Sequence, residues 1–143
     1  EAKAFQRVFD DAFPEMKDAV KEITKQARQD GFITTLYDRR LCVDTEVAYR
    51  GVNYKVQGSA AGLLKDCMIR AWRYKNTIPL DIHFVLTFHD ELIVEIKKEH
   101  AYPWVLKRIK NIMEDTHGIV DCPTPVDCEI VTKSWNLKEK ITI

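Results

Sequence analysis

The residues with the clearest chemical potential are three polar side chains, His89, Asp90 and Glu91, which lie between two apolar runs. The runs, Ile82–Phe88 and 92–96, are rich in β-branched and aromatic residues, which favours two strands of an antiparallel hairpin. The turn between them would then present two carboxylates and an imidazole. Because Mg²⁺ binds one or two carboxylates together with substrate phosphates, this turn is a candidate metal site. A solvated turn with no chemical role is the alternative, since turns commonly hold polar residues.

Asn53 and Gln57 form a second candidate site. They are four residues apart in a helical pattern, which places them on one helix face. Amide side chains can hydrogen-bond to base edges, including acceptors in the minor groove. A third candidate is a basic set that could contact phosphates: Lys17, Lys21, Lys25, Arg28, Arg39 and Arg40. For both groups the alternative is an ordinary solvent-exposed helix face.

Four helical segments are predicted around these candidates. Apolar residues recur at helical spacing in 1–12, 15–30, 45–74 and 99–117. Pro14 suits the first turn of the second helix, and Gly31 suits its C-terminal stop. In the third segment a bend is expected at 53–58, because Gly58 and its polar neighbours weaken a helix.

Strand patterns complete the expected fold. A short hairpin is predicted over 32–43, and alternating apolar residues over 125–135 indicate an edge strand. The expected class is α+β, with a small antiparallel sheet whose central hairpin, 82–97, packs against helices.

Composition limits the class of protein. The chain has 143 residues, of which 45% are hydrophobic and 31% are charged, so it can bury a core and is not expected to be disordered. It has no run of about 18 apolar residues and no signal-peptide pattern, so no membrane partner is expected. Lys and Arg number 22 and Asp and Glu number 22, so overall charge gives no support to nucleic-acid binding. The four cysteines lack metal-binding spacing and are expected to be reduced thiols: Cys42, Cys67, Cys122 and Cys128.

Four segments, taken in order, resemble the C-terminal part of DNA polymerase family A, the DNA polymerase I-like enzymes. They are GFITTLYDRR at 31–40, VQGSAA at 56–61, FHDELIVE at 88–95 and PVDC at 125–128, which leads to Trp135. The resemblance implies a palm-like fold with part of the fingers. Residues 1–143 would form a single C-terminal fragment, with about 1–50 at the fingers–palm junction and about 51–143 in the palm. Asp38 stands where the family usually has glycine, so a different turn is expected there. Together with departures from the family pattern at Tyr49, Lys55 and Gly62, it suggests a distant, phage-derived member.

The resemblance also implies an activity, template-directed DNA synthesis by two-metal nucleotidyl transfer. Asp90 would be one of two catalytic aspartates and would bind Mg²⁺. His89 would lie near the primer terminus, and Glu91 would be an auxiliary acidic group close to the metals. Asn53 and Gln57 would contact the minor groove of the primer–template.

Arg39 and Arg40 match a basic pair of the family motif and would be further DNA-binding residues. The implied partners are primer–template DNA, deoxynucleoside triphosphates and N-terminal polymerase segments that are missing from the chain. Those segments would carry the second aspartate and the nucleotide-binding Arg, Lys and Tyr side chains. Since catalytic groups act together, the chain alone is expected to be inactive. The implied location is the cytoplasm of a bacterium or of a phage-infected host cell.

Two other functions are open at this point. A palm-like chain could serve as a non-catalytic DNA-binding module or subunit. A two-metal nuclease that uses Asp90 and Glu91 is a weaker alternative, because adjacent residues on a tight turn seldom point to a shared site. A second carboxylate that meets Asp90 from another segment would separate the polymerase from the non-catalytic module.

Overall fold

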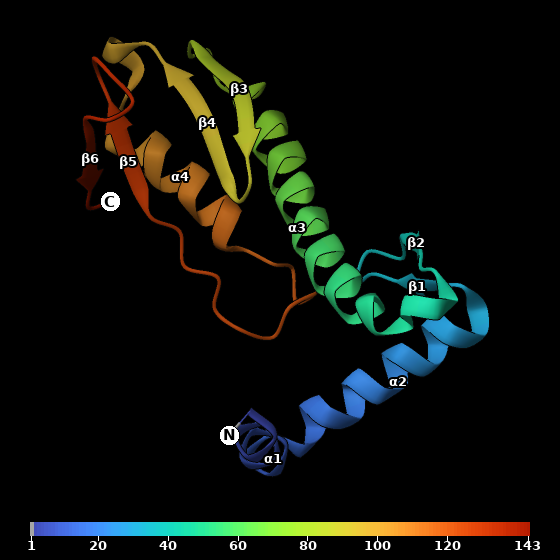
Figure 1. The fold of residues 1–143 in the computed structure, drawn as a ribbon. Coiled ribbons are helices and arrows are strands. Elements are labelled where there is room, and N and C mark those ends of the chain that lie inside the picture. The colour runs from blue at the N-terminus through green and yellow to red at the C-terminus, as the bar shows by residue number, and fades with distance from the viewer. Residues whose placement is uncertain (1) are drawn as a thin grey trace. The chain divides into compact units, whose positions relative to one another are not determined.

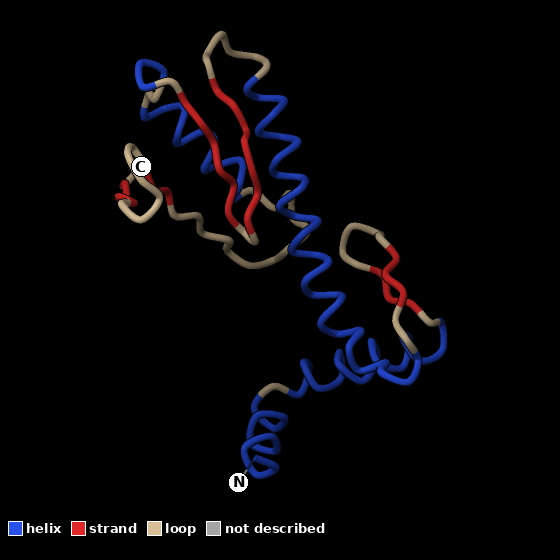
Figure 2. Tube along the Cα trace, turned by 45° about the horizontal axis from the view of Figure 1, so that its top comes forward, coloured by secondary structure: helices blue, strands red, loops and turns tan. Residues whose placement is uncertain are grey.

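Helices and antiparallel strand pairs follow one another along the chain, which confirms the expected α+β class (Figure 1). The computed structural model describes residues 2–143. It divides into two compact units, Glu1–Gly62 and Leu63–Ile143, and the boundary falls inside helix α3 (Gly51–Lys75). Figure 2 shows that the strands form separate two-stranded pairs.

The first unit begins with two helices and a short hairpin. Its elements are α1 (Ala2–Ala12), α2 (Pro14–Asp30), β1 (Phe32–Thr34), β2 (Arg40–Cys42), the 3-10 helix η1 (Thr45–Arg50) and the first half of α3. Pro14 occupies the first turn of α2, as predicted, where its missing N–H costs no hydrogen bond. Gly31 ends α2 with a left-handed φ of 73°, and its N–H donates to the carbonyl of Ala27 at 3.1 Å.

The core of the first unit is made of small and branched side chains. The buried residues are Ala27, Ile33, Val43 and Ala48. They come from α2, β1, the end of the hairpin and η1, so this cluster holds the β1–β2 hairpin against the C-terminal half of α2.

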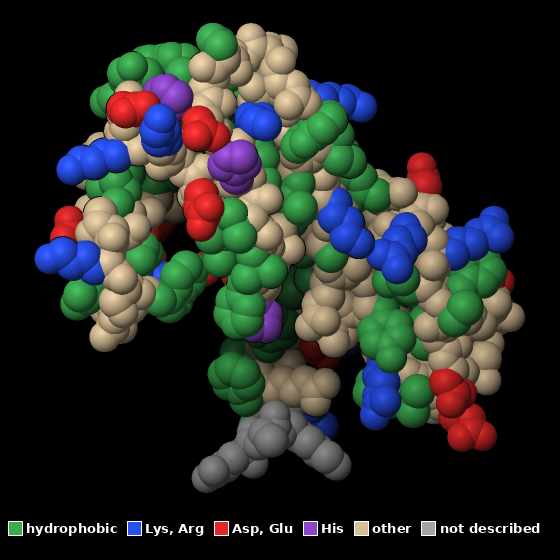
Figure 3. Space-filling model, turned by 90° about the horizontal axis from the view of Figure 1, so that it is seen from above, with side chains coloured by type: hydrophobic (Ala, Val, Ile, Leu, Met, Phe, Trp, Pro, Cys, Tyr) green, Lys and Arg blue, Asp and Glu red, His purple; other side chains and the backbone are tan. Residues whose placement is uncertain are grey.

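The apolar face predicted for α1 forms but is not covered. Phe5 and Val8 are 74% and 68% exposed, and Phe13 and Met16 continue the exposed apolar surface into α2. The side chain of Ala2, a further apolar residue of this helix, lies outside the side chains that the structure describes. Figure 3 shows hydrophobic side chains exposed among charged ones on the face that it views.

Thr35 organises the loop between β1 and β2. Its N–H donates to the carbonyl of Arg39 at 2.9 Å, and its hydroxyl accepts the N–H groups of Tyr37 and Arg39 at 3.3 and 3.2 Å. Asp38 takes a φ of 56°, in the left-handed region that glycine enters most easily. The backbone at position 38 therefore has a glycine-like conformation despite the aspartate.

The bend predicted at 53–58 is wrong, because α3 runs unbroken from Gly51 to Lys75. The irregularity falls earlier, at Val47 in η1, whose φ of −116° and ψ of 35° are not helical. The expectation came from the low helix propensity of Gly58. Helix propensity is a weak preference of single residues, and tertiary packing overrides it here.

Two glycines of α3 make room for the β1–β2 hairpin. A Cβ at Gly58 would lie 2.6 Å from Cδ1 of Leu41 and 2.9 Å from Cγ2 of Thr35. One turn further on, a Cβ at Gly62 would lie 2.5 Å from Cδ2 of Tyr37. The loop and the helix can therefore approach closely only because both positions lack a side chain.

The second unit contains the predicted central hairpin. Its elements are the remainder of α3, β3 (Ile82–Phe88), β4 (Glu91–Ile96), the 3-10 helix η2 (Lys98–His100), α4 (Pro103–Glu114), β5 (Cys128–Val131) and β6 (Lys138–Ile141). Ile82 of β3 packs against Val105 and Ile109 of α4, and all three are buried. One face of the hairpin thus packs against a helix, as predicted, whereas Val85 and Leu86 are exposed.

Arg70 links α3 to the end of α4. Its Nε lies 2.8 Å from Oδ2 of Asp66, one helical turn away. Its guanidinium also donates to the backbone carbonyl of Asp115 at 2.6 Å. Hydrogen bonds from a charged donor are stronger than neutral ones, so Arg70 stabilises the junction between these helices.

Two boundaries in the second unit differ from the predictions. The helix expected over 99–117 is shorter: α4 starts at Pro103 and ends at Glu114, after the short η2. The strand expected over 125–135 is not an edge of the central hairpin, because β5 pairs with β6 instead. The segment of β6 is too rich in charge to show a strand pattern, so its pairing with β5 was missed.

The cysteines are free thiols, and only Cys67 is buried. Its thiol lies 3.6 Å from the carbonyl of Met113, and burial raises its pKa. Burial also raises the pKa of the half-buried Cys128 thiol. Within residues 2–143, no helix combines the length and the apolar character needed to cross a membrane.

Candidate active site

The tip of the β3–β4 hairpin is a two-residue turn formed by His89 and Asp90. Glu91, predicted as part of the turn, is the first residue of β4 and pairs with Phe88. Its charge suggested a turn, but strand ends tolerate charged side chains. His89 has a φ of 54°, which fits the tight turns that match the twist of paired strands. Asp90 therefore projects from a short and well-defined turn.

Strand pairing and packing hold this turn in place. Ile82 pairs with Ile96, and Phe84 pairs with Val94, at the end of the hairpin that packs on α4. Val85 is an extra residue in β3, so the register shifts there and a β-bulge forms. Bulges increase the local twist of a strand pair. One end of the hairpin is therefore anchored by packing on α4, and the other end carries the turn.

The two carboxylates next to each other at the tip have different surroundings. Asp90 is exposed, and no hydrogen bond or ion pair holds its side chain within residues 2–143. The Oε1 atom of Glu91 lies 3.4 Å from the Nζ atom of Lys138 in β6. The ring of His89 packs edge-on against Phe88, with 4.4 Å between centroids. Asp90 is therefore the tip carboxylate available to an external cation.

A single carboxylate does not make a metal site. Among the residues described, no group of three or more His, Cys, Asp or Glu side chains could hold a metal ion. The donor chemistry of Asp90 fits Mg²⁺, which takes one or two protein carboxylates and completes its shell with water and phosphate oxygens. The exposed carboxylate of Asp90 could supply one such ligand.

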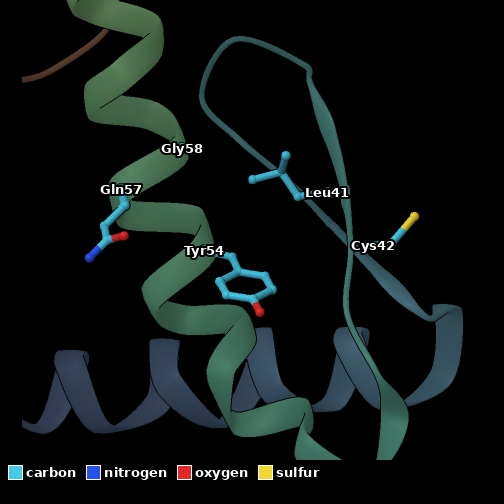
Figure 4. Close-up of a pocket in the computed structure, with 5 residues that line it drawn as sticks. All are labelled: Leu41, Cys42, Tyr54, Gln57 and Gly58. Carbon is cyan, nitrogen blue, oxygen red and sulfur yellow. The ribbon is translucent and has the colours of Figure 1, made fainter.

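Asn53 and Gln57 lie one turn apart on α3 in the first unit, and both are exposed. Gln57 borders a shallow hollow, whose lining residues are Leu41, Cys42, Tyr54, Gln57 and Gly58. In Figure 4 the ring of Tyr54 turns toward the hairpin, whereas the amide of Gln57 points to the other side of the helix. The structure thus confirms the shared helix face, and the Gln57 amide can reach an external partner.

Arg39 and Arg40 are both exposed on the β1–β2 hairpin. The Cζ atom of Arg40 lies 4.9 Å from the ring centroid of Phe32, a favourable position for a cation over an aromatic face. Arg39 is fixed through its backbone, which exchanges hydrogen bonds with Thr35. Their DNA-binding role stays a prediction.

Two lysines of the predicted basic set form ion pairs with nearby carboxylates. Lys17 lies 3.3 Å from the carboxylate of Asp10, and Lys21 lies 2.9 Å from that of Asp18. These ion pairs favour the reading of α2 as an ordinary solvent-exposed helix face for these two lysines.

The candidate residues fall into two groups. His89, Asp90 and Glu91 belong to the second unit, whereas the amides of α3 and the arginines of the hairpin belong to the first. In the second unit the predicted residues lie together at the β3–β4 turn. In the first unit Asn53 and Gln57 share an exposed face of α3, whereas Arg39 and Arg40 lie on the β1–β2 hairpin.

Sequence reasoning missed Lys138. Desolvation lowers the pKa of its ammonium group, but the hydrogen bond to Glu129 and the charges of Glu129 and Glu91 outweigh this effect, so the pKa is raised. The nearby Trp135 and the alternating charges of 138–140 were visible in the sequence. They carried no signal for contact with Glu91, which is 47 residues away.

The chain is similar to known polymerases over most of its length. A model of DNA polymerase family A matches residues 1–137. The thermostable DNA polymerase I of Thermus filiformis is 29% identical over 146 aligned residues, which cover 94% of this chain and 17% of that protein. The DNA polymerase of Mycobacterium phage D29 is 28% identical, with coverage of 89% and 20%. The chain therefore belongs to DNA polymerase family A.

A solved structure supports the same relationship. The polymerase domain of Pol1 from M. smegmatis, in complex with DNA primer-template and dNTP, matches with a TM-score of 0.77 and 27% identity. The match covers 86% of this chain and 23% of that one. The chain also spans only about a fifth or less of the curated relatives cited above.

Proposed function

We propose that this chain is the C-terminal part of a polymerase domain that carries out template-directed DNA synthesis by two-metal nucleotidyl transfer. The observation that carries the proposal is Asp90, an exposed carboxylate that has no partner within residues 2–143 and lies on the two-residue turn of an anchored hairpin. The family membership of the chain supports the proposal, because the resemblance of the His89–Glu91 segment to the family motif implies that Asp90 would be a catalytic aspartate.

Asp90 would act as a ligand of Mg²⁺ and would share it with a second aspartate from outside this chain. When bound, two divalent metals stabilise the attacking and leaving oxygens of an in-line phosphoryl transfer. The short turn supports this role, because a rigid platform holds a ligand more accurately than a mobile loop. His89 would lie near the primer terminus, and Glu91 would be an auxiliary acidic group.

Asn53 and Gln57 would contact the minor groove of the primer–template. Their exposure and shared helix face support this role. Minor-groove acceptors are similar in all correctly paired steps, so amides there can test pair geometry without selecting a sequence. Arg39 and Arg40 would contribute contacts to the phosphates.

We further propose that N-terminal polymerase segments cover the apolar surface of α1 and α2. Exposed apolar patches of this kind commonly mark interfaces. The surface consists of Phe5, Val8, Phe9, Phe13, Met16 and Val20. Residues 1–50 would then belong to the fingers–palm junction and 51–143 to the palm. Bacterial and phage relatives support a cytoplasmic place of action in a bacterium or an infected cell.

The test is the variant Asp90→Asn in the polymerase that carries this chain. Loss of the ionised carboxylate removes a metal ligand, so primer extension should fall by about 10³-fold or more. Binding of primer–template, measured by fluorescence anisotropy, should stay close to that of the unchanged protein.

Asp121→Asn is the matched control, because Asp121 is also an exposed aspartate and has no proposed role. The control variant should extend primers at the normal rate. Normal extension by Asp90→Asn would instead remove Asp90 from the metal site and with it the proposed mechanism.

A further inference from the structure

Lys138 is the centre of a charged cluster that the proposed mechanism does not use. Its Nζ atom lies 3.4 Å from Oε1 of Glu91 and 3.3 Å from Oε2 of Glu129. The same atom lies 4.2 Å from the ring centroid of Trp135. The Lys138 side chain is 26% exposed, against 47% for Glu91 and 44% for Glu129. Two carboxylates and an aromatic face therefore enclose the ammonium group on several sides.

The neighbouring lysine of β6 provides a comparison. Lys140 lies 2.8 Å from Oδ2 of Asp127, and its side chain is 66% exposed. This pair is an ordinary surface ion pair between the ends of the β5–β6 hairpin. Lys138 differs because its partner Glu91 comes from another hairpin and directly follows Asp90.

The cluster also lies at the limit of the family match. The family model ends at residue 137, so Lys138 and the rest of β6 lie beyond it.

We propose that Lys138 is a positioning residue for the hairpin tip. It holds the carboxylate of Glu91 against the β5–β6 hairpin and so leaves Asp90 as the tip carboxylate that receives a divalent cation. The inference rests on the proposed function, because it takes Asp90 to be a metal ligand.

Electrostatics gives the expected direction of the effect. Without the ammonium group, Glu91 is released and its charge next to Asp90 is no longer neutralised. A divalent cation is then attracted more strongly, but two mobile carboxylates hold it in more than one geometry. Affinity for the metal should rise while the rate of the reaction falls.

The first measurement is primer extension against Mg²⁺ concentration for Lys138→Met in the polymerase that carries this chain. The half-saturating Mg²⁺ concentration should fall by about two- to fivefold, the range set by a partly exposed ion pair. The maximal rate should also fall. Lys138→Arg should restore both values, and the matched control Lys140→Met should change neither. A merely structural role would lower the rate without shifting the Mg²⁺ requirement.

The second measurement needs neither metal nor DNA. In the metal-free protein with ¹³C-labelled lysine, the ring current of Trp135 should shift the terminal methylene resonance of Lys138 upfield. Glu91→Gln should move this resonance toward the free-lysine value, because one of the two carboxylates that hold the ammonium is lost. Asp127→Asn should leave it in place.

An unchanged Mg²⁺ requirement in Lys138→Met would overturn the positioning role. An unchanged Lys138 resonance in Glu91→Gln would overturn the contact itself. Normal activity of Asp90→Asn would refute the proposed function instead. In that case the resonance would still report whether Lys138 holds Glu91, so the two failures are distinguishable.

Discussion

Asp90 and Glu91 show that neighbouring carboxylates can differ completely in what surrounds them. Asp90 is in the turn and has no partner within residues 2–143, whereas Glu91 is in a strand and lies against Lys138. The chemistry expected of a carboxylate therefore depends on its position in the hairpin and not on its acidity alone.

Gln57 can be tested at the same scale. In the polymerase that carries this chain, Gln57→Ala should lower primer extension by about tenfold or more, because a bidentate amide contact to a base edge contributes about 1–3 kcal/mol. The melting temperature should change little, since Gln57 is exposed. Extension kinetics and thermal denaturation are the measurements.

Gln29→Ala is the matched control, because Gln29 is an exposed glutamine on α2 with no proposed role. It should leave extension unchanged. If both variants changed primer extension equally, Gln57 would be an ordinary exposed helix residue without a specific DNA contact.

At the scale of elements, the contact between the β1–β2 hairpin and α3 depends on small residues. Ser59 is buried beside the glycines, and its hydroxyl accepts the N–H of Leu36 at 3.0 Å while donating to the carbonyl of Lys55. The loop that carries Arg39 is thus attached to the helix that carries Gln57. Both groups of proposed DNA contacts in the first unit depend on this attachment.

Gly62→Ala tests the attachment. At a helix position without close neighbours, this change raises the free energy of unfolding by about 1 kcal/mol, because alanine has a higher helix propensity than glycine. Here the new Cβ would lie 2.5 Å from the Tyr37 ring, so we expect a net loss of about 1–2 kcal/mol in the free energy of unfolding. Chemical denaturation measures it.

The double variant provides the control for the clash. When Tyr37→Ala is already present, Gly62→Ala should raise the free energy of unfolding, because the clash is gone and only the higher helix propensity of alanine remains. A stabilising effect of Gly62→Ala in the presence of Tyr37 would contradict the close approach of loop and helix.

At the scale of the whole molecule, the proposed function gives one explanation for the exposed apolar surface of α1 and α2 and for the Asp90 carboxylate, which has no partner within residues 2–143. Both would be parts of an assembly whose other half comes from further polymerase segments. An apolar helix face needs a partner to be buried, and a two-metal site needs a second carboxylate.

The purified chain should therefore show no templated primer extension with Mg²⁺ and deoxynucleoside triphosphates. The catalytic groups act as a unit, so a site that lacks one aspartate and the nucleotide-binding side chains loses nearly all of its rate. A gel-based extension assay, with the intact polymerase as the positive control, is the measurement.

Templated extension by the chain alone would show that it contains a complete site and would refute this expectation. If the polymerase that carries the chain were also inactive while the chain still bound primer–template, the non-catalytic DNA-binding module would become the better explanation.

Features that depend on neighbouring residues could be predicted from the amino-acid sequence. Continuous β-branched and aromatic runs predicted β3 and β4, and Pro14 and Gly31 marked the start and end of α2 correctly. The same local patterns located Asp90 at a turn and placed Asn53 and Gln57 on one helix face. These predictions succeeded because turn chemistry and side-chain periodicity act over a few residues.

Features that depend on residues far apart in the chain could not be predicted in this way and are seen only in the folded protein. The role of Gly58 was mistaken for a bend because its reason, the approach of Thr35 and Leu41, lies in another element. The pairing of β5 with β6 and the contact of Lys138 with Glu91 were missed for the same reason. A charged side chain has no sequence signature for a partner that is distant in the chain, because a long-range ion pair depends on which surfaces the fold brings together.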